Sequence, residues 1–158
     1  MLDPAKDALA HCEITNLLSL YYQALDRGQL DVLEREVMAE DATWELIQLA
    51  SSGRVEDKVS GRANVLAWFR KMLSGGVTMS EGTVRHFIGT HVIRIDGDSA
   101  SSTSHLHAID TRTMVTLANG FVEAEHQRGD QGWRIRSYRV EESITESDMQ
   151  ALRETFGS

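Results

Sequence analysis

The 158-residue sequence has one cysteine, Cys12, and one proline, Pro4. A single cysteine excludes an internal disulfide framework and an all-cysteine zinc site. Cys12 lies among apolar residues at helical spacing, which predicts a place in the core. With no proline after position 4, no stiff proline-rich linker divides the chain, and we expect residues 1–158 to form one domain.

Basic charge and long apolar runs are also scarce. The chain carries 16 Lys and Arg against 24 Asp and Glu, a formal charge of −8. Nucleic acids and anionic membranes both attract basic surfaces, so we expect neither as a partner. No apolar run approaches the ~20 residues of a membrane span. The first ten residues lack the apolar core of a signal peptide, which predicts a cytoplasmic protein.

Motifs that bind nucleotide cofactors or activate a serine are missing as well. The sequence contains neither the Gly-x-Gly-x-x-Gly loop that cradles a pyrophosphate nor the Gly-x-Ser-x-Gly nucleophile elbow. Gly75-Gly76 stands alone. We therefore expect no cofactor.

The apolar pattern of the first half is mainly helical. Asp3 and Pro4 are typical of a helix start, and apolar residues recur at helical spacing up to Asp26, where Gly28 favours an end. Further along, the pattern predicts helices over 30–37 and 63–73, a strand over 41–47, and a loop or short hairpin over the polar segment 51–61.

The second half changes to strands. Apolar patterning and turn signals predict strands over 86–95, 100–109, 114–125 and 133–140. Thr145 and Asp148 resemble a capping box, which predicts a short C-terminal helix over 145–154. Helices followed by a run of antiparallel strands indicate an α+β fold rather than alternating β-α units.

Six histidines are the most notable chemical feature, and two of them suggest a metal site. His105 and His107, followed by Asp110, share one face of a predicted strand, as a metal would require. Metal-binding β-barrels with this pattern add a third histidine on a later strand that bears glycine and proline, which this chain lacks. We therefore expect no metal, and we expect the two histidines to face solvent or another subunit.

Asp26 and His86 are candidates for acid–base chemistry. Taken alone, Asp26 could equally be a solvated carboxylate at a helix end. His86 opens an apolar strand and could equally be a core histidine with satisfied hydrogen bonds. Composition and spacing do not show that the two side chains meet.

The segment from Tyr21 to Leu33 resembles the first-helix signature of the SnoaL-like branch of the nuclear transport factor 2-like superfamily. Within that branch it is similar to the bile-acid 7α-dehydratases. Arg85-His86-Phe87-Ile88-Gly89 and the tail Arg153-Glu154-Thr155-Phe156-Gly157 are similar to scytalone dehydratase. The resemblance covers about residues 10 to 157. It implies a cone: a curved antiparallel sheet against three helices of the N-terminal half, with a short C-terminal helix and a pocket at the open end.

The resemblance also implies a site. Asp26 matches the carboxylate that orients an imidazole, and His86 matches the histidine that takes a proton from carbon. The position five before the aspartate, Tyr21, is a further catalytic candidate, although helix geometry favours Tyr22 as the same-face neighbour of Asp26. We expect the substrate pocket to include Tyr22, Leu25, Trp44, Ile88, Asp110, Tyr138 and Phe156.

The function implied by this resemblance is a cofactor-independent lyase. A histidine–aspartate dyad would eliminate water from a cyclic or polycyclic hydroxy-ketone, a hydrophobic small molecule. A polyketide cyclase or ketosteroid-type isomerase with the same dyad, or a non-catalytic small-molecule-binding protein, are the alternatives. The family also buries one sheet face between subunits, so we expect a homo-oligomer, a trimer or a dimer.

Overall fold

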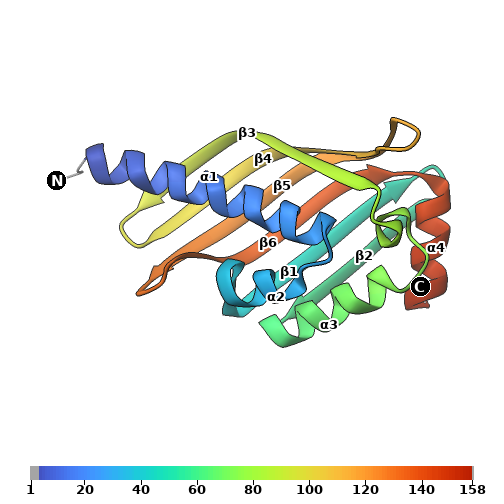
Figure 1. Cartoon of the computed structure of the whole chain (residues 1–158), viewed down its shortest axis with the longest axis horizontal. Helices are drawn as coiled ribbons and strands as arrows, with labels where there is room; N and C mark the ends of the chain where they lie inside the picture. The colour runs from blue at the N-terminus through green and yellow to red at the C-terminus, as the bar shows by residue number, and fades with distance from the viewer. Residues whose placement is uncertain (1–3, 158) are drawn as a thin grey trace.

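The computed structural model of the chain describes residues 4–157 and confirms the α+β fold (Figure 1). The expected helix cap Asp3 lies outside the described residues. The helical elements are α1 (Pro4–Asp26), α2 (Leu30–Val32) with the π-helical turn Leu33–Val37 that continues it, α3 (Arg62–Leu73), the 3₁₀ turn Thr78–Glu81 and α4 (Glu146–Phe156). The strands are β1 (Met38–Ala50), β2 (Gly53–Ser60), β3 (Val84–Asp96), β4 (Ser99–Asp110), β5 (Val115–Gly129) and β6 (Gly132–Ile144).

The strands form one six-stranded sheet in the order β2-β1-β6-β5-β4-β3. Four junctions are antiparallel, but β1 and β6 run parallel. The last strand, β6, lies beside β1 and runs in the same direction. The sheet is therefore mixed rather than wholly antiparallel. β2 and β3 form the two edges, so the curved sheet does not close into a barrel.

The polar segment 51–61, expected as a loop or short hairpin, forms a tight turn and the edge strand β2. Its backbone pairs with β1 from Thr43 opposite Ser60 to Ala50 opposite Gly53. Val55 is buried while most of its neighbours along the strand are exposed. An edge strand with one face in solvent carries mostly polar side chains, which explains why its sequence is typical of a loop.

The helices cover one face of the sheet, and the apolar core lies between the two layers (Figure 1). α1 packs against β3 and β6, α3 packs against β1 and β2, and α4 contacts β1 and α3. In α1, Ile14 and Leu18 are fully buried, whereas Cys12 is exposed. The expectation of a core cysteine was wrong, because Cys12 lies on the solvent side of the helix.

The end of α1 determines where Asp26 lies. The N–H groups of Gly28 and Gln29 donate to the carbonyl groups of Leu25 and Ala24 at 3.0 and 2.8 Å, which closes the last turn. Gly28 has a φ of +66°, a left-handed conformation that glycine adopts without a steric penalty. The chain therefore turns sharply after Asp26, and the Asp26 side chain lies beside the first residues of β3.

Candidate active site

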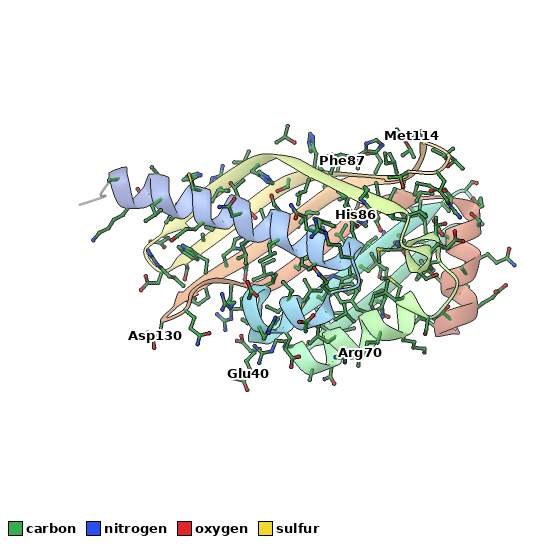
Figure 2. The ribbon with its side chains drawn as sticks, in the orientation of Figure 1. Glu40, Arg70, His86, Phe87, Met114 and Asp130 are labelled. Carbon is green, nitrogen blue, oxygen red and sulfur yellow. The ribbon has the colours of Figure 1, made fainter. Side chains whose placement is uncertain are left out.

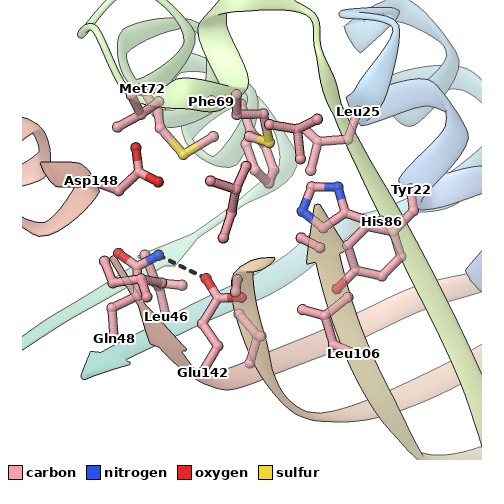
Figure 3. A pocket seen from close by; sticks show the side chains of 18 of the residues that line it. Tyr22, Leu25, Leu46, Gln48, Phe69, Met72, His86, Leu106, Glu142 and Asp148 are labelled. Carbon is pink, nitrogen blue, oxygen red and sulfur yellow. Dashed lines mark hydrogen bonds between the residues drawn. The ribbon is translucent and has the colours of Figure 1, made fainter. Parts of the chain in front are cut away.

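Asp26, the last residue of α1, meets His86 near the start of β3. Asp26 Oδ1 lies 2.5 Å from His86 Nδ1, and Asp26 Oδ2 accepts the backbone N–H of His86 at 2.9 Å. The side chain of His86 is 9% exposed and that of Asp26 is 7% exposed. An ionised carboxylate only accepts hydrogen bonds, so in the neutral imidazole Nδ1 carries the proton and Nε2 keeps its lone pair. The ring of His86 faces a cavity (Figure 3).

Three buried tyrosines adjoin this pair. The Tyr22 ring stacks on the His86 ring with centroids 4.8 Å apart, and its hydroxyl accepts the hydroxyl proton of Tyr138 at 2.5 Å. Tyr21 stacks on Tyr138 with centroids 4.5 Å apart and accepts from Trp44 Nε1 at 3.1 Å. Burial raises the pKa of all three phenols. Each is therefore neutral at pH 7 and keeps a proton that can be donated.

The cavity beside His86 has a volume of about 90 Å³. Most of its wall is apolar and comes from both layers of the fold. The lining residues that are apolar or aromatic include Tyr21, Tyr22, Leu25, Trp44, Leu46, Phe69, Met72, Val77, Met79, Leu106, Tyr138, Val140 and Leu152. Such a wall excludes water and favours an apolar ligand.

A second polar group, which no motif in the sequence indicates, lines the same cavity. Gln48 on β1 and Glu142 on β6 are paired residues of the parallel junction, and Gln48 Nε2 donates to Glu142 Oε1 at 2.7 Å. Burial raises the pKa of Glu142. Asp148, at the start of α4, also lines the cavity, and its carboxylate accepts the N–H and the hydroxyl of Thr78, each at 2.8 Å.

Three residues expected at the pocket are not among those that line it. Ile88, two residues after His86 on β3, packs against the core but does not line the cavity. Asp110 ends β4 and accepts the N–H of Arg112 at 3.0 Å, and this bond lowers the pKa of the carboxyl. Phe156 stacks on Trp68 of α3, with centroids 4.9 Å apart, outside the cavity. Asp110 therefore stabilises a turn, and Phe156 fastens α4 to α3.

The expected outward direction of His105 and His107 is confirmed. Both are exposed on β4, and His105 contacts the ring of Phe121 edge-on, with centroids 5.1 Å apart. Phe87 is on the same outer face, whereas its neighbour His86 points toward the helices (Figure 2). Within residues 4–157, no three His, Cys, Asp or Glu side chains gather as metal ligands would. No helix in this range is long and apolar enough to cross a bilayer.

Comparison with protein families gives a match to the SnoaL-like domain over residues 6–139. The chain belongs to this family. The family includes enzymes such as polyketide cyclases and dehydratases. Among curated proteins, none matches the chain.

Solved structures confirm the fold. A cystatin-like-fold protein of unknown function from Nostoc punctiforme is 18% identical, with a TM-score of 0.70 over 89% of this chain and 94% of that one. An NTF2-like protein from Novosphingobium aromaticivorans is 18% identical, with a TM-score of 0.67 over 96% and 92%. A protein from the same organism, assigned as the β subunit of an aromatic-ring-hydroxylating dioxygenase, is 15% identical, with a TM-score of 0.70 over 89% and 93%. At these identities the likeness extends to the fold alone.

Proposed function

We propose that this SnoaL-like protein is a cofactor-independent dehydratase, a lyase in which His86 and Asp26 remove water from a cyclic hydroxy-ketone. The observation that carries the proposal is the orientation of His86: Asp26 occupies Nδ1, and the ring faces an apolar cavity. A neutral imidazole is a usable base at neutral pH, and a carboxylate on its other nitrogen stabilises the imidazolium that forms.

The elimination needs only groups that already line the cavity. Nε2 of His86 takes a proton from the carbon next to the ketone, and the electrons of that C–H bond form an enolate. The enolate re-forms the ketone and a carbon–carbon double bond as the β-hydroxyl leaves. The imidazolium returns its proton to that hydroxyl, which departs as water. Substrate equals product plus water, with no oxidant or reductant.

A tyrosine hydroxyl would stabilise the enolate oxygen. The family resemblance implies Tyr21 for this role, but the ring contacts support the alternative, Tyr22. Tyr22 stacks directly on His86, and its hydroxyl accepts from Tyr138, so its own proton can point to a ligand. Tyr21 contacts Trp44 and Tyr138 instead.

The size of the cavity favours a small substrate. Its volume of about 90 Å³ is below the ~150 Å³ of an engineered cavity that holds benzene. A single ring fits with modest adjustment, and a polycyclic substrate would require the wall to move. Met72 and Met79 line the cavity, and methionine is the side chain that adapts most readily.

The test is a screen of cyclic β-hydroxy-ketones for loss of water, read by mass spectrometry, with His86→Gln as the matched control. We expect wild-type protein to release water and the variant to be severely impaired. Equal rates of water loss with both proteins would contradict the proposal.

The same dyad also suits the alternative of a cyclase or isomerase, because both reactions begin with proton abstraction next to a carbonyl. Incubation in D₂O separates the two. A dehydratase gives a product that has lost water. An isomerase gives a product that keeps all its heavy atoms and shows deuterium incorporation or a shifted double bond. Ligand binding without either outcome would favour a non-catalytic binding protein.

We also expect a homo-oligomer formed through the outer face of β3, β4 and β5. Phe87 and Phe121 are 57% and 62% exposed there, beside His105 and His107. Exposed aromatic patches of this kind mark interaction surfaces. Light scattering at micromolar concentration should give a dimer or trimer, and Phe121→Lys should shift it toward monomer. A wild-type monomer would contradict this expectation.

A further inference from the structure

We propose that Gln48 and Glu142 form a hydroxyl-binding subsite, which holds a neutral hydroxyl group of the ligand on a different wall of the cavity from His86. The proposal rests on the proposed function only for the location of the reacting carbon at His86. Figure 3 shows the pair and the histidine on separate walls, with the cavity between them.

Gln48 has an acceptor that the protein leaves unused. The side chain is 7% exposed, and its Nε2 donates to Glu142. Its Oε1 is buried and has no hydrogen-bond partner among the described residues. A buried carbonyl oxygen without a donor carries a free-energy cost, because it has lost its hydrogen bonds to water. Because Gln48 lines the cavity, a donor on the ligand would remove this cost.

Glu142 supplies the complementary donor when its carboxyl is protonated. It is 9% exposed, and one of its oxygens, Oε1, is occupied by Gln48. Burial raises the pKa of the carboxyl, while the hydrogen bond from Gln48 and the charge of His86 oppose the rise. A protonated carboxyl offers one O–H through its second oxygen. The pair therefore presents one free acceptor on Gln48 and, when Glu142 is protonated, one donor beside it.

The rows of side chains along the two strands support a ligand with an apolar body and a polar end. On the inner face, Trp44 pairs with Tyr138, Leu46 with Val140, and Gln48 with Glu142. The wall changes from aromatic to aliphatic to polar along these rows. An apolar ring would pack on Leu46 and Val140, with its hydroxyl against the polar pair.

The donors, acceptors and charges of this subsite discriminate among the polar groups that a ligand could carry. A hydroxyl can donate to Gln48 Oε1 and also accept from Glu142 when that carboxyl is protonated. A ketone or an ether can only accept, which leaves Gln48 unsatisfied. A carboxylate would approach both Glu142 and Asp148 and would be repelled when either is ionised. The subsite therefore favours alcohols and phenols over ketones, ethers and anions.

The test uses phenol and toluene, which have the same number of heavy atoms and differ by a hydroxyl in place of a methyl group. The ratio of the toluene Kd to the phenol Kd is measured by NMR titration for each protein, so that differences in hydration of the probes cancel between variants. Gln48→Met should lower this ratio about tenfold, the effect of one neutral hydrogen bond. Glu142→Gln keeps a donor and should lower it less.

Two controls locate the hydroxyl. Gln150→Met makes the same chemical change on the exposed side of α4 and should leave the ratio unchanged. His86→Gln should also leave the ratio unchanged, although we expect it to lower kcat by roughly 10²–10⁴-fold. A ratio that is unchanged in Gln48→Met, or that falls as far in His86→Gln, overturns the subsite.

A crystal structure of the wild-type protein with phenol gives a second test, which holds even if Gln48→Met does not fold. The phenol oxygen should lie within hydrogen-bond distance of Gln48 Oε1. An oxygen placed on His86, or on neither residue, overturns the proposal. Because these tests measure binding alone, they fail separately from the dehydratase: absence of water loss would remove the proposed reaction and leave the phenol preference as measured.

Discussion

His86, which is partly buried, and His126, which is buried, have opposite surroundings. His86 contacts the carboxylate of Asp26 and lines the cavity. His126 on β5 is 2% exposed, bonds only to the hydroxyl of Ser102 at 2.8 Å, and has a buried Nδ1 without a partner among the described residues. Burial lowers the pKa of His126 to about 4.

The difference shows what turns a core histidine into a candidate base. Burial alone disfavours the imidazolium, so His126 stays neutral at pH 7 and is a poor proton acceptor. A carboxylate beside the ring stabilises the imidazolium by Coulomb attraction, and a cavity gives a substrate access to the second nitrogen. His86 has both features, whereas the ring of His126 has no carboxylate partner among the described residues.

The largest expected effect is on turnover. Once a substrate is known, His86→Gln should lower kcat by roughly 10²–10⁴-fold, because it removes the base and keeps similar volume. His126→Gln should leave kcat near that of the wild type. Steady-state rates of both variants, with circular dichroism as a check of folding, make the comparison. A larger loss in His126→Gln would reverse the assignment of the two histidines.

Replacing the carboxylate tests whether the dyad acts as a unit. Asp26→Asn should also lower kcat by roughly 10²–10⁴-fold, because an amide can favour the wrong tautomer of the imidazole. The double variant Asp26→Asn with His86→Gln should be little slower than the slower single variant. Multiplicative losses in kcat would mean that the two residues act independently.

His126 should make the protein less stable in acid. Its pKa is about 4 when folded against 6.5 as the ordinary value, so the unfolded chain binds the proton more tightly. The contribution of His126 to the unfolding free energy is therefore fully present above pH 6.5. It is lost as the pH falls from 6.5 to about 4, by about 3 kcal/mol in all. Urea unfolding at several pH values measures this loss.

His126→Gln provides the matched control for that measurement. The variant should show a shallower dependence of the unfolding free energy on pH between 6.5 and 4, whereas His107→Gln, at an exposed position, should keep the wild-type slope. An unchanged slope in His126→Gln would assign the acid sensitivity to the carboxylates instead.

Local patterns were sufficient to predict most of the fold, whereas the pairing of Asp26 with His86 was expected only from the family resemblance. Helical spacing and a glycine indicated the end of α1, and the parity of β4 placed His105 on the outside. No local signal indicated that β1 and β6 run parallel, because that pairing joins segments nearly 100 residues apart. Gln48 and Glu142 meet only through this junction, so neither could be chosen from the sequence.

The smallest expected effect concerns the tyrosines around His86. Tyr22→Phe removes the hydroxyl of the ring that stacks on His86 and should lower kcat by about tenfold, the loss of one hydrogen bond in the transition state. Tyr21→Phe removes an acceptor of Trp44 Nε1 and should lower the unfolding free energy by about 1 kcal/mol with less effect on kcat. Neither variant should change the acid sensitivity that His126 confers. Steady-state rates and urea unfolding of both variants decide between the two tyrosines. A larger loss of kcat in Tyr21→Phe would return the role of proton donor to Tyr21, as the family resemblance first implied.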